Sequence, residues 1–144
     1  GFIGFHQCPN TTLPSDTDRF VGTEADATWH YDPRILSRPN DYNAIASSIE
    51  KIMIETFTGP SDVGIYSKSV QETLFIMCKN SLQAQPAVDK IDMYMPNLHY
   101  IPFPLDKIGL VNKDHTGKPD VFFPIDEPHG MIKASVERNN RSRL

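Results

Sequence analysis

The sequence predicts an α+β domain in which an antiparallel β-sheet is backed by two consecutive helices. Alternation of apolar and polar residues, typical of half-buried strands, occurs before residue 32 and again after residue 90. Between these regions lie two stretches with apolar residues at helical spacing. This order favours antiparallel pairing with the helices on one face, because a parallel sheet needs strands and helices that alternate along the chain.

The first strands are expected in the N-terminal part of the chain. A short strand is predicted at residues 2–8 and a long one at residues 19–31. The segment 37–41 then breaks the chain and offers an N-cap for the first helix. The alternating residues of the long strand are Val21, Thr23, Ala25, Ala27, Trp29 and Tyr31.

Two helices follow this break. The first ends at Gly59-Pro60 and the second at Pro86. The second begins with a capping box, in which the Ser69 side chain caps the Glu72 amide and the Glu72 side chain bonds back. The apolar faces consist of Ile45, Ile49, Ile52, Met53 and Phe57 in the first helix and of Val70, Leu74, Met77, Cys78 and Leu82 in the second.

Strand patterns return after the second helix. Residues 91–95 alternate between apolar and polar, and Pro96-Asn97 then turns the chain. Further strands are expected at residues 99–103, 121–123 and 132–136, the last two joined by a turn-rich segment. The second half of the chain is therefore expected to complete the antiparallel sheet.

The composition excludes several classes of function. Fourteen basic and eighteen acidic residues give a net charge of −4, which does not favour nucleic-acid binding. No apolar run reaches the length of a membrane span. Cys8 and Cys78 lack metal-type spacing and are interpreted as reduced thiols of an intracellular protein. The histidines are scattered, so we expect no metal site.

The start of the second helix is a candidate anion site. The amides of Val70 and Gln71 and the positive end of the helix dipole favour a flat anionic ligand, and the Gln71 carboxamide suits the edge of a heterocycle. Arg19 can contact a delocalised anion with two nitrogens, and Phe2 can stack on a ring. From spacing alone, structural roles explain these residues better than ligand binding does. Gln71 would be a solvated residue of the first helical turn, Arg19 a surface charge at a strand end and Phe2 a core residue.

Asn97 and His99 form a second candidate pair. One residue apart in an extended segment, their side chains point the same way. An amide and an imidazole on one face can hold a small polar molecule and relay a proton. A turn asparagine and a structural histidine explain the pair about equally well.

The two ends of the chain differ in character. It opens with Gly1-Phe2, without an initiator Met or signal peptide, and is interpreted as a piece of a longer protein. Residues 138–141 are polar, and residues 138–144 are expected to form a flexible tail after a domain that spans residues 1–137. The final Ser142-Arg143-Leu144 is a variant of the Ser-Lys-Leu import tripeptide, which predicts a peroxisomal location and an import receptor as partner.

Short motifs occur over nearly the whole chain. They are Gly1-Phe2-Ile3-Gly4-Phe5, Thr11-Thr12-Leu13, Asp18-Arg19, Asp26-Ala27-Thr28-Trp29, Ser69-Val70-Gln71, Met95-Pro96-Asn97-Leu98-His99-Tyr100 and Gly109-Leu110-Val111-Asn112. In this order, and with the peroxisomal ending, they resemble the C-terminal half of the uricase (urate oxidase) family. One departure is Asn10, where the family signature usually has an aromatic residue; this puts local packing in doubt more than chemistry.

The resemblance implies a fold and an activity. Uricases consist of two tandem tunnelling-fold (T-fold) domains, each an antiparallel sheet backed by two helices, and homotetramers close these sheets into a tunnel. The opening strand of the second domain is expected before Gly1. The implied enzyme is an oxidoreductase of purine catabolism, which oxidises urate with O₂ and water to 5-hydroxyisourate and hydrogen peroxide without a metal or organic cofactor.

The resemblance also implies roles for the candidate residues. Phe2 stacks on the purine, Arg19 forms a fork with the urate anion, and Gln71 pairs with the opposite edge together with the Val70 amide.

The resemblance implies that catalysis is shared between two halves of the protein. By the resemblance, Asn97 holds O₂ or the attacking water, and His99 belongs to the proton relay. The family's catalytic Lys and Thr lie in the N-terminal half and reach the pocket from a neighbouring subunit. We therefore expect this chain to be inactive without that half.

Two other interpretations remain open. The first is a non-catalytic purine- or pterin-binding T-fold module. Pterin-handling relatives anchor their ligand through a Glu, so that Gln71 favours urate. The second is a structural fragment that only assembles with other chains, against which the set of pocket side chains argues mildly.

Overall fold

The computed structural model describes residues 3–12, 14–15, 20–35, 41–125 and 129–138 of the chain. In chain order the elements are β1 (Asp26–Tyr31), α1 (Tyr42–Thr58), α2 (Val70–Ala84), β2 (Val88–Pro96), β3 (His99–Pro102), the 3-10 helix η1 (Leu105–Ile108), β4 (Phe122–Ile125) and β5 (Met131–Glu137). The fold class predicted from the sequence is confirmed: strands flank two consecutive helices, and all described strand pairs are antiparallel.

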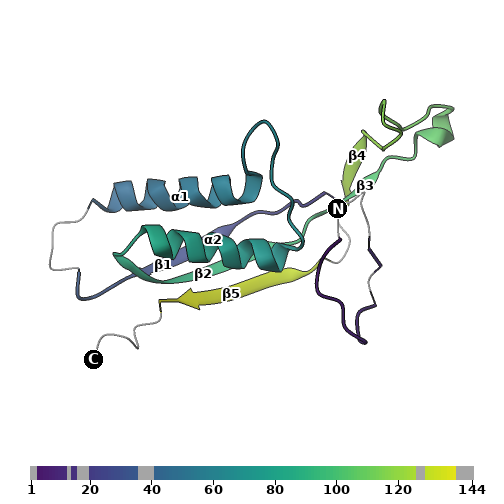
Figure 1. Cartoon of the computed structure of the whole chain (residues 1–144). Coiled ribbons are helices and arrows are strands. Elements are labelled where there is room, and N and C mark those ends of the chain that lie inside the picture. Colours follow the sequence, from purple (N-terminus) through teal and green to yellow (C-terminus); the bar gives the residue numbers. More distant parts are fainter. Residues whose placement is uncertain (1–2, 13, 16–19, 36–40, 126–128, 139–144) are drawn as a thin grey trace.

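The strands form two separate sheets. β1, β2 and β5 make a three-stranded sheet in the order β1-β2-β5, and β3 pairs with β4 in a two-stranded hairpin. Figure 1 shows α1 and α2 side by side over one face of the larger sheet, with the β3–β4 hairpin projecting from one end of it. The domain therefore consists of a two-layered body, formed by α1, α2 and the three-stranded sheet, and of an arm, formed by β3, β4 and the segment between them.

The core lies between the helices and the larger sheet. Ile91 at the centre of β2 is fully buried and lies between Trp29 on β1 and Val136 on β5. Along each strand, alternate residues point toward the helices because the side-chain period of a strand is two. The buried apolar core consists of Ile45, Ile49, Met53, Val70, Leu74, Met77, Cys78, Leu82, Val88, Ile91, Met93 and Met95.

The opposite face of this sheet carries polar side chains. Asp92 lies at its centre, between Thr28 on β1 and Ser135 on β5. The Ser135 hydroxyl donates to Asp92 Oδ1, while His30 Nε2 and Lys90 Nζ lie 2.8 Å and 3.1 Å from Asp92 Oδ2. These contacts, led by the Ser135 hydrogen bond, hold the pKa of the Asp92 carboxyl well below its usual range.

Both helices begin and end where the sequence predicts. The Asp41 side chain accepts from the Ala44 amide at 3.0 Å and caps α1, which ends before Gly59. Gly59 has φ 68°, and its amide bonds to the Glu55 carbonyl. A side chain at this position would be strained and would also collide with Gly64 and Ile65, so a glycine is required here.

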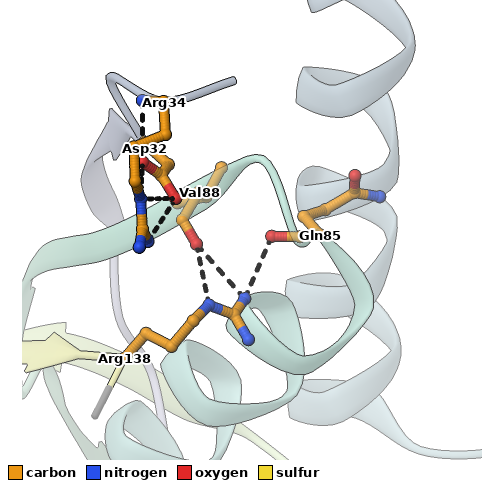
Figure 2. Close-up of polar contacts among 5 residues, drawn as sticks. All are labelled: Asp32, Arg34, Gln85, Val88 and Arg138. Atoms are coloured by element: carbon orange, nitrogen blue, oxygen red, sulfur yellow. Dashed lines mark hydrogen bonds and ion pairs between the residues drawn. The ribbon is translucent and has the colours of Figure 1, made fainter. Parts of the chain in front are cut away.

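Arg138 binds backbone carbonyls at the end of the body away from the arm (Figure 2). Its guanidinium Nη2 donates to the carbonyls of Leu82, Gln85 and Val88, the last two at 3.2 Å each, and its amide donates to Asp89 O at 2.7 Å. Carbonyls at a helix C-terminus have no intrahelical partners, and a cation there also complements the helix dipole. Arg138, which the sequence pattern assigns to a flexible tail, is thus anchored to α2 and β2; residues 139–144 lie outside the described ranges.

The long strand predicted at residues 19–31 is shorter in the structure, where β1 covers only Asp26–Tyr31. Asp26 pairs with Tyr94, and continuing this register would place Glu24 opposite Pro96, which has no N–H to donate. Residues 23–25 accordingly belong to no strand, and pairing in the same register returns only at a single bridge. Gly22 then forms an isolated antiparallel bridge with Leu98.

The short strand predicted at residues 2–8 is also wrong for the described residues 3–8, which belong to no strand. Gly4 has φ 71°, outside the β region. At Cys8 the chain turns: the Thr11 amide donates to the Cys8 carbonyl at 2.9 Å. Local turn geometry therefore outweighs the strand pattern in this segment.

Candidate functional site

The start of α2 is built by a capping serine. The Ser69 hydroxyl accepts from the Glu72 amide at 3.1 Å, and Ser69 itself is extended, as an N-cap residue should be. This half of the predicted capping box is confirmed. The Glu72 carboxylate lies 3.8 Å from Lys68 Nζ, an exposed pair one helical turn apart.

The segment before Ser69 braces this helix start. The Ser67 hydroxyl donates to the Ser69 carbonyl at 3.1 Å and lies 2.6 Å from the hydroxyl of Thr73, which is buried. The Tyr66 hydroxyl accepts from the Ile3 amide at 2.8 Å and donates to the Ile3 carbonyl at 3.0 Å. The N-terminal segment of the chain is thereby fixed next to the start of α2.

Val70 and Gln71 occupy the first turn of α2. Val70 is 5% exposed and packs in the core, whereas Gln71 is exposed. Amides of the first helical turn have no intrahelical acceptor, and here the Ser69 hydroxyl already takes the Glu72 amide. The Val70 and Gln71 amides thus remain as donors at the positive end of the helix, with the Gln71 carboxamide beside them.

Asn97 and His99 lie at the junction between β2 and β3. The Asn97 amide donates to the Gly130 carbonyl at 2.8 Å, and the Leu98 amide donates to the Gly22 carbonyl at 2.9 Å. His99 opens β3 opposite Ile125. The side chains of Asn97 and His99 are half-buried. Hydrogen bonds hold Asn97 and Leu98, and strand pairing holds His99.

The two candidate pairs share one end of the domain. Only a short turn separates Ala84, the end of α2, from Val88, the start of β2, so the helix and the strand run in opposite directions. The 15 residues of α2 and the 9 residues of β2 span about 22 Å and about 30 Å by their standard rises. The start of α2 and the end of β2 therefore lie at the same end of the body, where the β3–β4 arm projects (Figure 1).

Several predicted site residues lie outside the described ranges: Phe2, Arg19 and the tripeptide Ser142-Arg143-Leu144. Described neighbours of Phe2 and Arg19 are tied to the same end of the body. Ile3 bonds to Tyr66 before α2, and Gly22 bonds to Leu98 between Asn97 and His99.

Sequence reasoning misses three residues that organise this region. Tyr66 anchors Ile3, Gly22 contacts the Asn97–His99 junction, and Asn112 braces the arm. The side-chain nitrogen Nδ2 of Asn112 donates to the carbonyls of Phe103 and Val121 at 2.9 Å and 2.7 Å, and its Oδ1 accepts from the Val121 backbone amide at 3.0 Å. A glycine inside an alternating pattern is a signal of close backbone approach and could have identified Gly22.

The described ranges offer neither a metal cluster nor a membrane helix. Within them, no group of three or more His, Cys, Asp or Glu side chains is arranged to hold a metal ion. None of the helices there combines the length and the apolar character needed to cross a bilayer.

Comparison with known families gives a clear result. The family model described as Uricase matches residues 1–133 of the 144 residues. This chain belongs to the uricase family. Uricase-2 isozyme 1 of Canavalia lineata is 37% identical over 145 residues, and the uricase of Oryctolagus cuniculus is 35% identical over 144 residues.

The chain corresponds to only part of such a uricase. The first match covers 96% of this chain and 46% of the Canavalia protein, and the second covers 100% of this chain and 45% of the Oryctolagus protein. The chain therefore spans just under half the length of these relatives.

Solved uricases have the same architecture. The uricase of Arthrobacter globiformis superposes with a TM-score of 0.73 at 28% identity, over 96% of this chain and 44% of that one. The urate oxidase of Bacillus sp. TB-90 superposes with a TM-score of 0.67 at 21% identity, over 95% and 42%, which supports the fold. The predicted T-fold, an antiparallel sheet backed by two helices, is confirmed.

Proposed function

We propose that this chain forms the C-terminal half of a urate oxidase and supplies the substrate-binding part of its active site. One observation carries the proposal. The capped start of α2, with Val70 and Gln71, and the Asn97–His99 junction share one end of a domain of the uricase family. Helix amides suit an anion, and an amide beside an imidazole suits proton-coupled chemistry.

In the proposed complex, urate lies against the start of α2. Gln71 pairs with a lactam edge of the purine, assisted by the Val70 amide, and Arg19 forms a bidentate contact with the anion. Phe2 stacks on the ring. The bonds of Ile3 to Tyr66 support this assignment, because they hold the residue after Phe2 next to the segment that leads into α2.

The reaction joins urate, O₂ and water and gives 5-hydroxyisourate and hydrogen peroxide, so that two electrons pass from urate to O₂. Deprotonated urate supplies these electrons itself, and the proposal needs no metal or organic cofactor. The protein holds the reactants in place and moves protons. Asn97 holds O₂ or the attacking water, and His99 takes part in the proton relay.

The proposal extends to partners and location. The N-terminal half of the protein supplies a catalytic Lys and Thr from a neighbouring subunit, and homotetramers close the T-fold sheets into a tunnel. Residues 1–137 contribute most of the second T-fold domain, and the final Ser142-Arg143-Leu144 directs the protein to the peroxisome through an import receptor.

A non-catalytic purine- or pterin-binding T-fold module is the second candidate. It has the same fold and would use the same helix start. The amide side chain of Gln71 favours urate over a pterin, because pterin-handling relatives use a carboxylate there.

The deciding experiment is urate-dependent O₂ uptake by this chain after assembly with the N-terminal half of a related uricase. The chain alone and the N-terminal half alone serve as controls. We expect uptake, with equimolar hydrogen peroxide, only in the assembled sample. Assembly confirmed by size-exclusion chromatography, together with urate binding but no uptake, would instead support the binding module.

A further inference from the structure

The Asn97–His99 junction is in contact with Gly22, a glycine from a distant part of the sequence. The Leu98 amide donates to the Gly22 carbonyl at 2.9 Å, and the two residues form an isolated bridge. Gly22 is separated from Leu98 by more than seventy residues, so this contact connects the segment before β1 with the site junction.

The contact at Gly22 leaves no room for a side chain. A Cβ atom on Gly22 would lie 2.6 Å from Cε2 and 3.3 Å from Cδ2 of the Tyr100 ring, and 3.5 Å from the Leu98 Cβ. The first distance is shorter than real Cβ contacts allow, so either the ring or the backbone would have to move. Gly22 does not have a positive φ. The obstacle to a side chain at residue 22 is therefore the Tyr100 ring, which is 36% exposed, and not the backbone conformation.

The geometry also defines two sides of the junction. Gly22 and Leu98 are antiparallel bridge partners, so Gly22 lies beside the segment, and a Cβ built on it would point to the face that carries Leu98 and Tyr100. Neighbouring side chains of an extended segment point to opposite faces, so Asn97 and His99 lie on the other face. Gly22 thus borders a segment that carries the amide and the imidazole of the site on the face opposite to Tyr100.

We propose that Gly22, packed under the Tyr100 ring, is a positioning residue that sets the depth of Asn97 and His99 in the active site. The proposal rests on the urate oxidase function proposed above. Gly22 touches no reactant and acts through Leu98 and Tyr100. A substituent here collides with the Tyr100 ring and displaces the junction through it, and displacements of about 1 Å in a catalytic site cost up to roughly a hundredfold in rate.

The test is Gly22→Ala in the assembled enzyme. We expect kcat to fall by about tenfold to a hundredfold while KM for urate changes by no more than about threefold, because Asn97 and His99 act on O₂ and protons. A rise in KM with unchanged kcat would show that residue 22 positions only the urate-binding segment and would overturn the proposal. Unchanged kinetics would mean that the Tyr100 ring swings aside, which would overturn it as well.

Two variants control for general damage. Gly22→Ala/Tyr100→Ala removes the ring that the new methyl group meets, so kcat should return to that of Tyr100→Ala alone. Gly130→Ala lies at the other anchor of Asn97, where, among the described residues, a Cβ meets only Ile132 Cδ1 at 3.6 Å, so it should leave kcat unchanged. If Gly22→Ala does not fold, the double variant still tests the proposal. A folded double variant whose kcat lies below that of Tyr100→Ala overturns it.

Hydrogen exchange separates this inference from the proposed function. The Leu98 amide, bonded to Gly22, should exchange faster in Gly22→Ala than in the parent and recover in the double variant. This measurement needs no activity, so it tests the geometry even if the assembled protein does not oxidise urate. Equal Leu98 protection in parent and Gly22→Ala would contradict the proposal.

Discussion

The Tyr66 hydroxyl binds both backbone polar groups of Ile3, accepting from its amide at 2.8 Å and donating to its carbonyl at 3.0 Å. Two residues 63 positions apart are thereby joined next to the start of α2. This single hydroxyl positions the N-terminal segment of the chain.

Tyr66→Phe keeps the ring and removes both bonds. We expect the free energy of unfolding to fall by about 1 kcal/mol, since a partly exposed pair of hydrogen bonds contributes modestly. In the assembled enzyme KM for urate should rise, because Phe2, the proposed stacking residue, adjoins Ile3. Ile3 amide exchange and steady-state kinetics measure these effects, and Tyr42→Phe is the matched control. Unchanged exchange at Ile3 would contradict the expected loss of anchoring.

Arg19 and Asn97 should affect different steps. Arg19→Ala removes the proposed charged contact with urate and should weaken urate affinity tenfold or more, about 1.4 kcal/mol per tenfold. Asn97→Ala should lower kcat by about tenfold to a hundredfold with urate still bound. Equilibrium binding by calorimetry and O₂ uptake distinguish the two effects. Unchanged affinity in Arg19→Ala would refute the proposed binding site.

Gln71 tests whether the site selects urate. Gln71→Glu keeps the shape but places a carboxylate where an anionic purine should bind, and the lost donor leaves a urate carbonyl unpaired. We expect urate affinity to fall about tenfold or more, with thermal stability unchanged because the residue is exposed. Gln71→Asn, which keeps the amide but shortens the side chain, is the control variant. A Gln71→Glu protein that binds a pterin more tightly than urate would favour the binding module.

The two cysteines should differ in reactivity. The Thr11 hydroxyl, 3.6 Å from Cys8 Sγ, lowers the pKa of the exposed Cys8 thiol, whereas burial raises the pKa of the Cys78 thiol to about 11. Because the thiolate is the nucleophile, iodoacetamide at neutral pH should alkylate Cys8 first and Cys78 only after unfolding. Mass spectrometry of the peptides measures this. Thr11→Val should slow labelling of Cys8, and early labelling of Cys78 would mean that α2 opens readily.

Asp92 should make stability depend on pH. Its folded pKa is held below the usual range by Ser135, His30 and Lys90, so the stabilisation is complete above the unfolded carboxyl pKa of about 4 and is lost as pH falls toward the folded pKa. Asp92→Asn should therefore lower the melting temperature at pH 7, and the difference from the parent should shrink below about pH 4. Asp26→Asn, on the same face, is the control. A difference in melting temperature that does not change with pH would rule out the Asp92 carboxylate as a source of the pH dependence.

Local patterns predicted most of the body. The helix limits follow from Asp41, Ser69 and Gly59, whose effects act within a few residues. The alternation in β2 and β5 predicted the strands that cover the core. The long strand predicted before β1 is interrupted because Pro96 has no N–H to offer Glu24, and pairing returns only at the Gly22–Leu98 bridge. Gly4, with a positive φ, likewise interrupts a pattern that periodicity alone cannot distinguish from a strand.

The sequence identified candidate site residues but not the contacts that position them. Side-chain chemistry and a cap were sufficient to identify Gln71 and the pair Asn97 and His99 as candidates. What holds them depends on contacts between distant parts of the chain: Tyr66 with Ile3, and Gly22 with Leu98. Such contacts have no local signature, because they depend on which loops the fold brings to one end of the sheet.

The contacts of Arg138 bear on how this domain acquires its structure. The carbonyls of Leu82 and Val88 receive this guanidinium from a residue 56 and 50 positions later in the chain. The α1–α2 pair alone therefore lacks the cation that Arg138, just after β5, supplies to the end of α2. Contacts of such high sequence separation slow folding, since loop-closure entropy is lost before they form. We expect the Arg138 contacts to form late in folding, so a fragment that stops at residue 137 should fold at a similar rate but unfold faster, beginning at the α2–β2 turn.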